Sequence, residues 1–344
     1  MSQSLLNHGT INNEPKEGST HAVPVPEYSR FTRRQRWLIV VLATISATFS
    51  GFASNIYFPA IPHIAHDLGT SIENINLTVT TYMVFQALTP TLWGALSDVY
   101  GRRVTLMSTK SLKLDIAAPI RILFYPEVFV TLLFLSLHYA TWQMAVTAQS
   151  SLFNTIYGLD DLHIGLTFLA NGFGCMIGTL TTGKLLDHDY KRMQANFTGN
   201  PADFPIEHAR LHTVWFWSPL QWFAMLLFGW SLDKRLHVAA PIVASFVLAW
   251  AAMSIQSVIS TLVVDVFPTQ SASATAALNL ARCLLGAAST AAVEPTMKRI
   301  GTGWTFTLWT GLLVMSLVLV GVQQRWGAIW RKRREARERD KETM

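Results

Sequence analysis

Apolar runs of membrane-spanning length recur along the whole chain, and they limit its possible folds more than any other feature. The hydrocarbon core of a bilayer requires about 20 mostly apolar residues in a spanning helix. Inside that core, backbone polar groups are satisfied only in helices or closed barrels. About eight runs have the helical length, at residues 37–58, 76–96, 122–149, 164–186, 214–231, 238–264, 274–296 and 304–322. The sequence therefore predicts an all-α, polytopic membrane protein.

Composition and charge argue against several other classes of protein. Only 14% of the 344 residues are charged, whereas soluble domains carry about 25%. The net charge of +6 comes from basic residues in loops and tails, which argues against nucleic-acid binding. Cys175 and Cys283 lie inside apolar runs, so no disulfide framework is expected. The sequence contains no nucleotide-binding loop, metal cluster or hydrolytic triad, so it predicts no enzyme activity, cofactor or metal.

The positions of lysine and arginine predict that both termini face the cytosol, because cytosolic segments are enriched in these residues. Basic residues precede the first run, and the run Arg331-Lys332-Arg333-Arg334 follows the last one. Residues 1–35 are polar and are predicted to form a disordered cytosolic tail. Residues 325–344 are predicted to form a basic cytosolic tail.

The most specific motif follows the second run and reads G-x-L-x-D-x-x-G-R-R. Its defining residues are Gly94, Asp98, Gly101, Arg102 and Arg103. A carboxylate is unfavourable at the negative end of a helix dipole. Asp98 therefore needs balance from the arginines or from the start of another helix. The pattern resembles the signature loop after the second helix in the major facilitator superfamily of secondary transporters.

A second, degenerate copy of this spacing lies at the predicted cytosolic end of the fourth run. It consists of Gly183, Asp187, Lys191 and Arg192, with the last two placed in the following loop. Such a repeat is expected when a transporter is built from two similar halves. Chance spacing is the alternative for so short a match.

Two further stretches narrow the resemblance. Residues 50–62 read SGFASNIYFPAIP, and residues 274–283 read ATAALNLARC. With the signature loop, they resemble the fungal drug:proton antiporters of the quinidine-resistance type, over about residues 36–108 and 118–331. The resemblance implies export of small drug-like or cationic compounds by proton antiport. The implied partners are the lipid bilayer, the substrate and protons. The plasma membrane is the expected location, with the vacuolar membrane as the alternative.

The chain departs from this family in the number of its spans. Members have two bundles of six helices, whereas the family's third to sixth spans have no counterpart in this sequence. Residues 36–107 would then be a two-span remnant of the N-terminal bundle, and residues 108–121 a cytosolic junction. Residues 122–324 would form a C-terminal six-helix bundle. The alternative function is therefore a transport-inactive truncated paralogue, a splice form or an incomplete gene model.

Polar residues inside the runs are the candidates for a substrate cavity, because such residues often line a pathway. Hydrogen bonding between helices is the alternative role. The candidates are Asn55, Gln86, His138, Tyr139, Gln143, Asn171 and Gln256. Imidazole changes charge near neutral pH, so His138 suits proton transfer, and a neutral histidine bonded to another helix is its alternative. Tyr139 could stack on an aromatic or cationic substrate.

Arg282 is a charge inside an apolar run and requires a partner. Asp265 and Asp98 are the candidate partners, and we expect a structural lock in preference to substrate binding. Glu127 lies near the end of its run and is not expected to carry protons. Asp98 is also predicted to approach the backbone of residues 271–275, where a helix N-terminus favours a carboxylate. That contact would join the N-terminal remnant to the bundle.

Overall fold

The computed structural model describes residues 32, 34–42, 45, 56–100, 118–195, 205–267 and 270–343. The chain divides into two compact units, Met1–Ala53 and Ser54–Met344. In the first unit, residues 34–42 and 45 are helical and exposed. The second unit contains all the elements described below.

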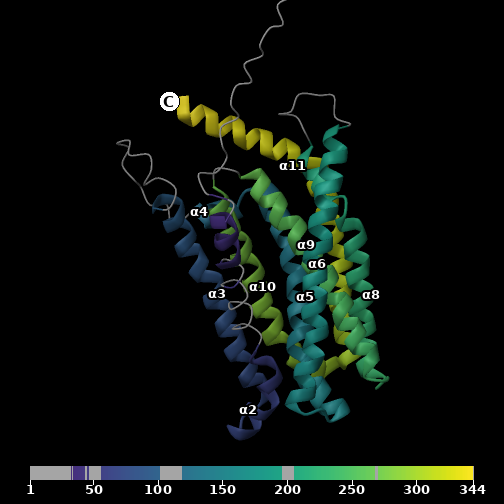
Figure 1. Cartoon of the computed structure of the whole chain (residues 1–344). Coiled ribbons are helices and arrows are strands. Elements are labelled where there is room, and N and C mark those ends of the chain that lie inside the picture. Colours follow the sequence, from purple (N-terminus) through teal and green to yellow (C-terminus); the bar gives the residue numbers. More distant parts are fainter. Residues whose placement is uncertain are drawn as a thin grey trace, which may run out of the picture. The chain divides into compact units, whose positions relative to one another are not determined.

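The described part of the second unit is built entirely from helices, which confirms the predicted all-α fold (Figure 1). The short elements connect or precede the long helices, and they are η1 (Phe58–Ala60), α2 (Ile61–Asp67), α4 (Ala118–Leu123) and α7 (Ile206–Leu211). The long helices are α3 (Ile72–Tyr100), α5 (Pro126–Tyr157), α6 (Asp161–Ala195), α8 (Val214–Asp233), α9 (Ala239–Val266), α10 (Ser271–Ile300) and α11 (Thr302–Thr343).

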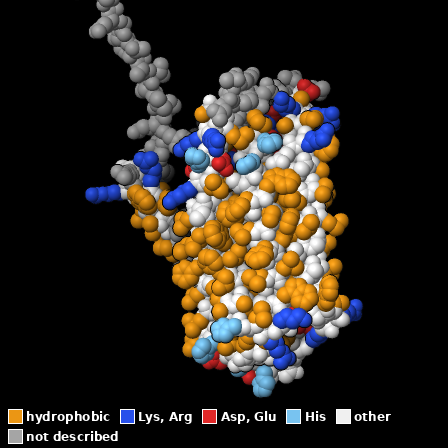
Figure 2. All heavy atoms as spheres, turned by 90° about the vertical axis from the view of Figure 1, so that its right-hand side faces the viewer, with side chains coloured by type: hydrophobic (Ala, Val, Ile, Leu, Met, Phe, Trp, Pro, Cys, Tyr) orange, Lys and Arg blue, Asp and Glu red, His pale blue; other side chains and the backbone are white. Residues whose placement is uncertain are grey.

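Five of the described helices, α5, α6, α9, α10 and α11, are long and apolar enough to cross a membrane. Figure 2 shows hydrophobic side chains covering the middle of one face, with charged side chains and histidines gathered towards its two ends. This pattern is that of a multi-pass membrane protein. Helices α3 and α8 coincide with two further predicted runs, and each contains a proline, Pro90 and Pro219. Most of the first run lies outside the described residues, so the count of eight spans stays a prediction.

Helices α6 and α9 approach each other closely because glycines line their contact. A Cβ atom built on Gly174 would lie 2.3 Å from the carbonyl oxygen of Phe246, and one on Gly178 would lie 2.7 Å from that of Trp250. Small residues allow this backbone approach between membrane helices, where van der Waals packing drives association. The exposed large side chains in the middle of α6 are apolar, including Leu166, Leu169 and Phe173, as expected for a helix that faces lipid.

Helix α3 packs along α10, and α10 packs on α5 (Figure 1). A Cβ atom on Gly286 would lie 2.6 Å from Cε of Met83 on α3 and 3.0 Å from Cε1 of Tyr139 on α5. The three helices are therefore in close contact where α10 carries this glycine. The predicted approach of Asp98 to residues 271–275 involves a side chain outside the described ones, and it stays a prediction.

The predicted run 122–149 is not one continuous helix, so this boundary was wrong. Helix α4 ends at Leu123, and α5 begins at Pro126. Tyr125 has φ −68° and ψ 129°, an extended conformation. The proline ring disfavours a helical conformation in the residue before it, which explains the break. Helix α5 then continues to Tyr157 and ends at Gly158, whose φ of 63° suits a residue without a side chain.

Two helices extend beyond their predicted ends. Helix α6 continues to Ala195, so Lys191 and Arg192 lie on a helix and not in the predicted loop. Helix α11 continues to Thr343, so most of the predicted C-terminal tail is helical. Figure 1 shows the last part of α11 running across one end of the bundle. Charged residues in these segments are favourable helix formers, which explains why the helices do not stop where the apolar runs stop.

Candidate functional site

The predicted cavity residues of α5 divide between two sides of that helix. His138 contacts α8 and α11, whereas Tyr139 contacts α10. Adjacent residues of a helix point about 100° apart, so the two side chains need not share a surface. The side chains of His138 and Tyr139 therefore belong to two different groups of contacts, although the residues are adjacent in the sequence.

His138 is 1% exposed and joins three helices. Its Nδ1 lies 2.8 Å from Oε1 of Gln221, and Nε2 of the same amide donates to the His138 carbonyl oxygen at 2.9 Å. Ser316 Oγ lies 3.5 Å from His138 Nε2. Because an amide oxygen only accepts, this arrangement places a proton on Nδ1. These contacts match the alternative of a histidine bonded to neighbouring helices, and its role in proton transfer stays a prediction.

Tyr139, Gln256, Asn279 and Arg282 meet in a second group, called here the Arg282 cluster. Arg282 donates from Nε and Nη2 to Oδ1 of Asn279, at 3.1 and 2.8 Å. Its Nη1 donates to Oε1 of Gln256 at 3.4 Å. The guanidinium carbon lies 4.8 Å from the centre of the Tyr139 ring, within the range of a cation–π contact. Three helices, α5, α9 and α10, thus hold one guanidinium.

Helix α3 is attached to the same cluster. Nδ2 of Asn279 donates to the backbone oxygen of Gln86 at 2.7 Å, and Cys283 Sγ lies 3.6 Å from Oδ1 of Asn279. At 1.5 Å of rise per residue, Arg282 lies about 16 Å along α10 from its start. The cluster therefore brings Gln86, Tyr139 and Gln256 of the predicted cavity together, beside three helices that are long and apolar enough to cross a membrane, α5, α9 and α10.

The predicted pairing of Asp265 with Arg282 is wrong. Asp265 accepts from Nε of Arg210 at 2.9 Å, and the Arg210 guanidinium also lies 4.4 Å from the centre of the Tyr190 ring. Asp265 occupies the last turn of α9, beside α7, whereas Gln256 is the residue of α9 that reaches Arg282. Among the described side chains, no carboxylate forms an ion pair with Arg282. The other candidate partner, Asp98, has a side chain outside that set.

The remaining predicted residues do not join the Arg282 cluster. Gln143 is buried on α5, and Asn171 is buried on α6, where its Oδ1 lies 3.7 Å from Sγ of Cys175. Gly183 and Asp187 lie exposed on α6. Other candidates cannot be placed: Asn55, Gly101, Arg102 and Arg103 lie outside the described residues, and Gly94 and Asp98 lie in α3 without described side chains.

Sequence reasoning missed two buried ion pairs made by the last part of α11, called here the α11 ion pairs. Arg331 donates from Nε to Glu207 at 2.8 Å, and Arg334 donates from Nε to Glu127 at 2.8 Å. Each of the four side chains is at most 8% exposed. Arg334 also lies 4.0 Å from the centre of the Phe267 ring. The spacing of the two arginines, i and i+3, places them on one helix face and was the available signal.

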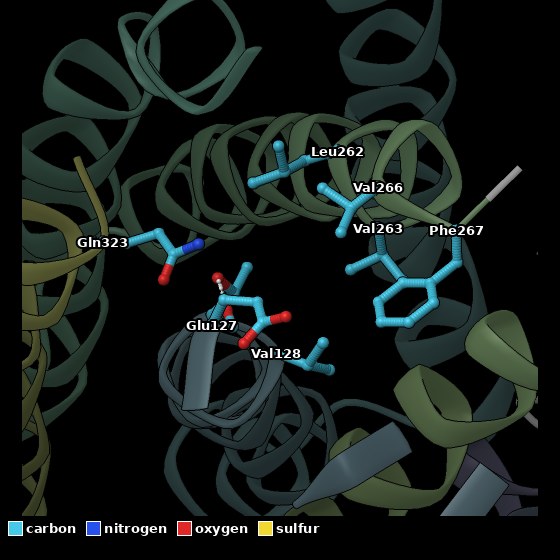
Figure 3. A pocket seen from close by; sticks show the side chains of 8 residues that line it. Glu127, Val128, Leu262, Val263, Val266, Phe267 and Gln323 are labelled. Carbon is cyan, nitrogen blue, oxygen red and sulfur yellow. Dashed lines mark hydrogen bonds between the residues drawn. The ribbon is translucent and has the colours of Figure 1, made fainter. Parts of the chain in front are cut away.

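A small cavity lies beside Glu127, between α5, α9 and α11. Figure 3 shows Glu127 and Gln323 directed into the same space, which Val263 and Phe267 also line. Its volume is about 10 Å³, which holds about one water molecule. Oε1 of Gln323 is buried without a hydrogen-bond partner among the described residues. The cavity is therefore a site for hydration and is too small for an organic substrate.

Comparison with known proteins supports a transporter. Residues 43–109 match the model of the Major Facilitator Superfamily. Citrate exporter 1 of Aspergillus niger is 27% identical over an alignment of 489 residues, which covers 96% of this chain and 93% of that protein. Multidrug transporter AQR1 of Candida glabrata is 33% identical over 68% of this chain and 41% of its own length.

MFS antiporter QDR2 of Candida albicans is 26% identical over 59% of this chain and 42% of its own length. No solved structure matches the chain significantly. The similar proteins are described as transporters, and none of those named here is an enzyme. With its apolar helices and its similarity to these transporters, the chain is therefore identified as a multi-pass membrane transporter and not as an enzyme, and residues 43–109 are similar to the Major Facilitator Superfamily.

Proposed function

We propose that this chain is a secondary transporter that exports small organic compounds by proton antiport. The observation that supports this most is the Arg282 cluster, where polar groups of α3, α5, α9 and α10 meet inside membrane-spanning helices. Polar and charged groups at such depth are costly, and they commonly mark a substrate or ion pathway. Alternating access would move helix α3 relative to α10 and the rest of the bundle around this cluster.

Two substrate classes are candidates. The names of the multidrug relatives favour drug-like compounds, including cations, and Tyr139 packs at 5.5 Å against Trp142 in an aromatic pair that suits them. The name of the citrate exporter favours an organic acid. The guanidinium of Arg282 lies beside the Tyr139 ring, and its charge would repel a cation there. We therefore place organic acids first.

Proton coupling would require a group that changes charge during the cycle. We assign this role to His138, which lies at the contact of α5, α8 and α11. A shift of α11 that breaks the Ser316 contact would change the hydrogen bonding of the ring, and so its affinity for a proton. The plasma membrane is the proposed location, with the vacuolar membrane as the alternative.

The second candidate is a transport-inactive, truncated form of such a transporter. The alignment with the citrate exporter spans 489 residues, which exceeds the 344 residues of this chain. That relative therefore contains segments without a counterpart here. This difference supports the proposed division into a two-span remnant at residues 36–107, a junction at 108–121 and a six-helix bundle at 122–324. Without four N-terminal spans, one wall of a central cavity would be missing.

Reconstitution of the purified chain in lipid vesicles tests the two candidates. Vesicles with an imposed proton gradient are assayed for uptake of radiolabelled citrate and of the fluorescent cation rhodamine 6G, against vesicles without protein. Uptake of either compound that collapses with a protonophore supports proton-coupled transport. If a monodisperse, correctly inserted chain transports neither compound, the result supports the second candidate, a transport-inactive truncated form.

A further inference from the structure

We infer that the guanidinium of Arg282 is a binding site for the carboxylate group of an organic acid. This inference rests on the proposed transport function and names the substrate class of the Arg282 cluster.

Arg282 is half-buried, and its charge is compensated differently from the charges of the buried arginines. Arg210, Arg331 and Arg334 each form an ion pair with a carboxylate. The described partners of Arg282 are the amides of Asn279 and Gln256 and the ring of Tyr139, all of which are neutral. A half-buried charge without an opposite charge beside it is less screened by water than an exposed one, so an anion that enters this position gains a favourable interaction.

The amide contacts leave donors available on Arg282. A guanidinium carries five N–H groups in a planar fork. The two amides accept from Nε, Nη1 and Nη2, each of which uses one N–H group. Among the described residues, one further N–H on each of Nη1 and Nη2 has no acceptor. These two unused N–H groups are available as donors to the oxygens of a carboxylate, the anion with which arginine forms its strongest hydrogen bonds.

The surroundings hold the guanidinium in place before a ligand arrives. Asn279 fixes one edge of the group, and Tyr139 covers one of its faces. A donor that is already oriented loses little conformational freedom on binding, which raises affinity. The same Asn279 side chain donates to the backbone of Gln86. A movement of α3 against α10 would therefore change the amide that positions Arg282, and this would link the anion site to alternating access.

Binding is tested on the full chain, purified in mild detergent, by titration with sodium citrate, succinate and acetate in a calorimeter. Arg282→Gln removes the charge, and Arg282→Lys keeps the charge but loses the planar fork. Arg299→Gln is the matched control, because Arg299 is exposed on the same helix and carries the same charge. We expect Arg282→Gln to weaken citrate binding about tenfold or more, and Arg282→Lys to weaken it less. The Arg299 variant should bind as the wild type does.

The outcomes separate this inference from the proposed function. Unchanged citrate binding in Arg282→Gln overturns the inference, and so does a wild-type chain that transports rhodamine 6G but binds none of the three acids. Citrate binding that depends on Arg282 without any vesicle uptake supports the inference while the transport function fails. If Arg282→Gln does not purify as a monodisperse protein, the citrate affinities of Arg282→Lys and the wild type are compared instead. Equal citrate affinity in the Lys variant and the wild type then overturns the inference.

Discussion

The arginines of the α11 ion pairs and Arg282 of α10 have opposite chemical surroundings within one helical unit. Arg331 and Arg334 are almost fully buried, and each meets a carboxylate at 2.8 Å. Arg282 is less buried and meets neutral amides and an aromatic ring. The first group satisfies its charge within the protein. The charge of Arg282 is not paired with a carboxylate among the described residues, so Arg282 remains available to bind an anion.

This difference in charge pairing predicts that the α11 ion pairs contribute to folding stability, whereas Arg282 contributes to function. A buried ion pair is strongly destabilised when one partner is removed, because the other charge is then buried alone. A guanidinium held by amides leaves only neutral groups behind when it is removed. Substitutions in the two regions should therefore have different effects on folding, and the following four experiments compare them in order of decreasing expected loss of stability.

Arg334→Ala should produce the largest loss, because it leaves Glu127 buried without its cation. We expect a decrease in the free energy of unfolding of about 3–5 kcal/mol. The measurement is denaturant unfolding in mild detergent, followed by tryptophan fluorescence. The double substitution Glu127→Leu with Arg334→Leu removes both charges and should restore most of the loss. If the single variant is as stable as the wild type, the distinction between the two regions fails.

Arg210→Gln should have an intermediate effect. Its partner Asp265 is 30% exposed, so water stabilises the carboxylate after the arginine is removed. We expect a loss of about 1–2 kcal/mol, between the values for buried and exposed pairs. The same unfolding assay applies, with Arg299→Gln as the exposed control. A loss as large as that of Arg334→Ala would show that partial exposure does not weaken this pair.

Arg282→Gln should change stability by less than about 1 kcal/mol, because glutamine can bond the same amides and no carboxylate is left unpaired. Its stability is measured beside that of Arg334→Ala, under the same conditions. A loss comparable with that of the α11 ion pairs would show that Arg282 acts as a structural lock. The sequence-based expectation would then be correct, and the anion site would lose its main support.

Asp160→Asn should cause the smallest loss of stability of the four substitutions. The backbone N–H of His163 and its ring lower the pKa of the Asp160 carboxyl group, which is exposed in the turn before α6. A lowered folded-state pKa stabilises the protein above the unfolded-state pKa, and this contribution is lost as pH falls through the folded-state pKa. Protection of the amides at the start of α6, which is the exchange rate corrected for the intrinsic rate at each pH, should therefore fall in acid for the wild type. The Asn variant should show little of this pH dependence, and an equal loss of protection in both proteins would exclude Asp160 as its cause.

Sequence alone predicted the helical fold and most helix positions, because the apolar runs have membrane-spanning length. It placed Gln86, Tyr139, Gln256 and Arg282 among the candidates, and the structure brings these four residues together. Which face of a helix meets which neighbour depends on tertiary packing, and one sequence does not contain that information. For this reason Asp265 was assigned to Arg282 and not to Arg210.

The ion pairs of the last part of α11 were missed for a different reason. A basic run after a last span is typical of a cytosolic tail, and this rule concerns insertion into the membrane and not packing. The carboxylates that bind Arg331 and Arg334 lie more than a hundred residues earlier in the chain. No local pattern connects them. The break before Pro126, in contrast, follows a local rule and was available from the sequence.

The α11 ion pairs also bear on any shortened version of this protein. A premature stop codon, or a protease that removes the chain just before Arg331, would leave all the apolar runs intact, so the product would still insert into a membrane. Glu127 and Glu207 would nevertheless lose their cations together. An inserted but shortened protein would therefore be expected to be less stable, and insertion and stability would depend on different parts of the chain.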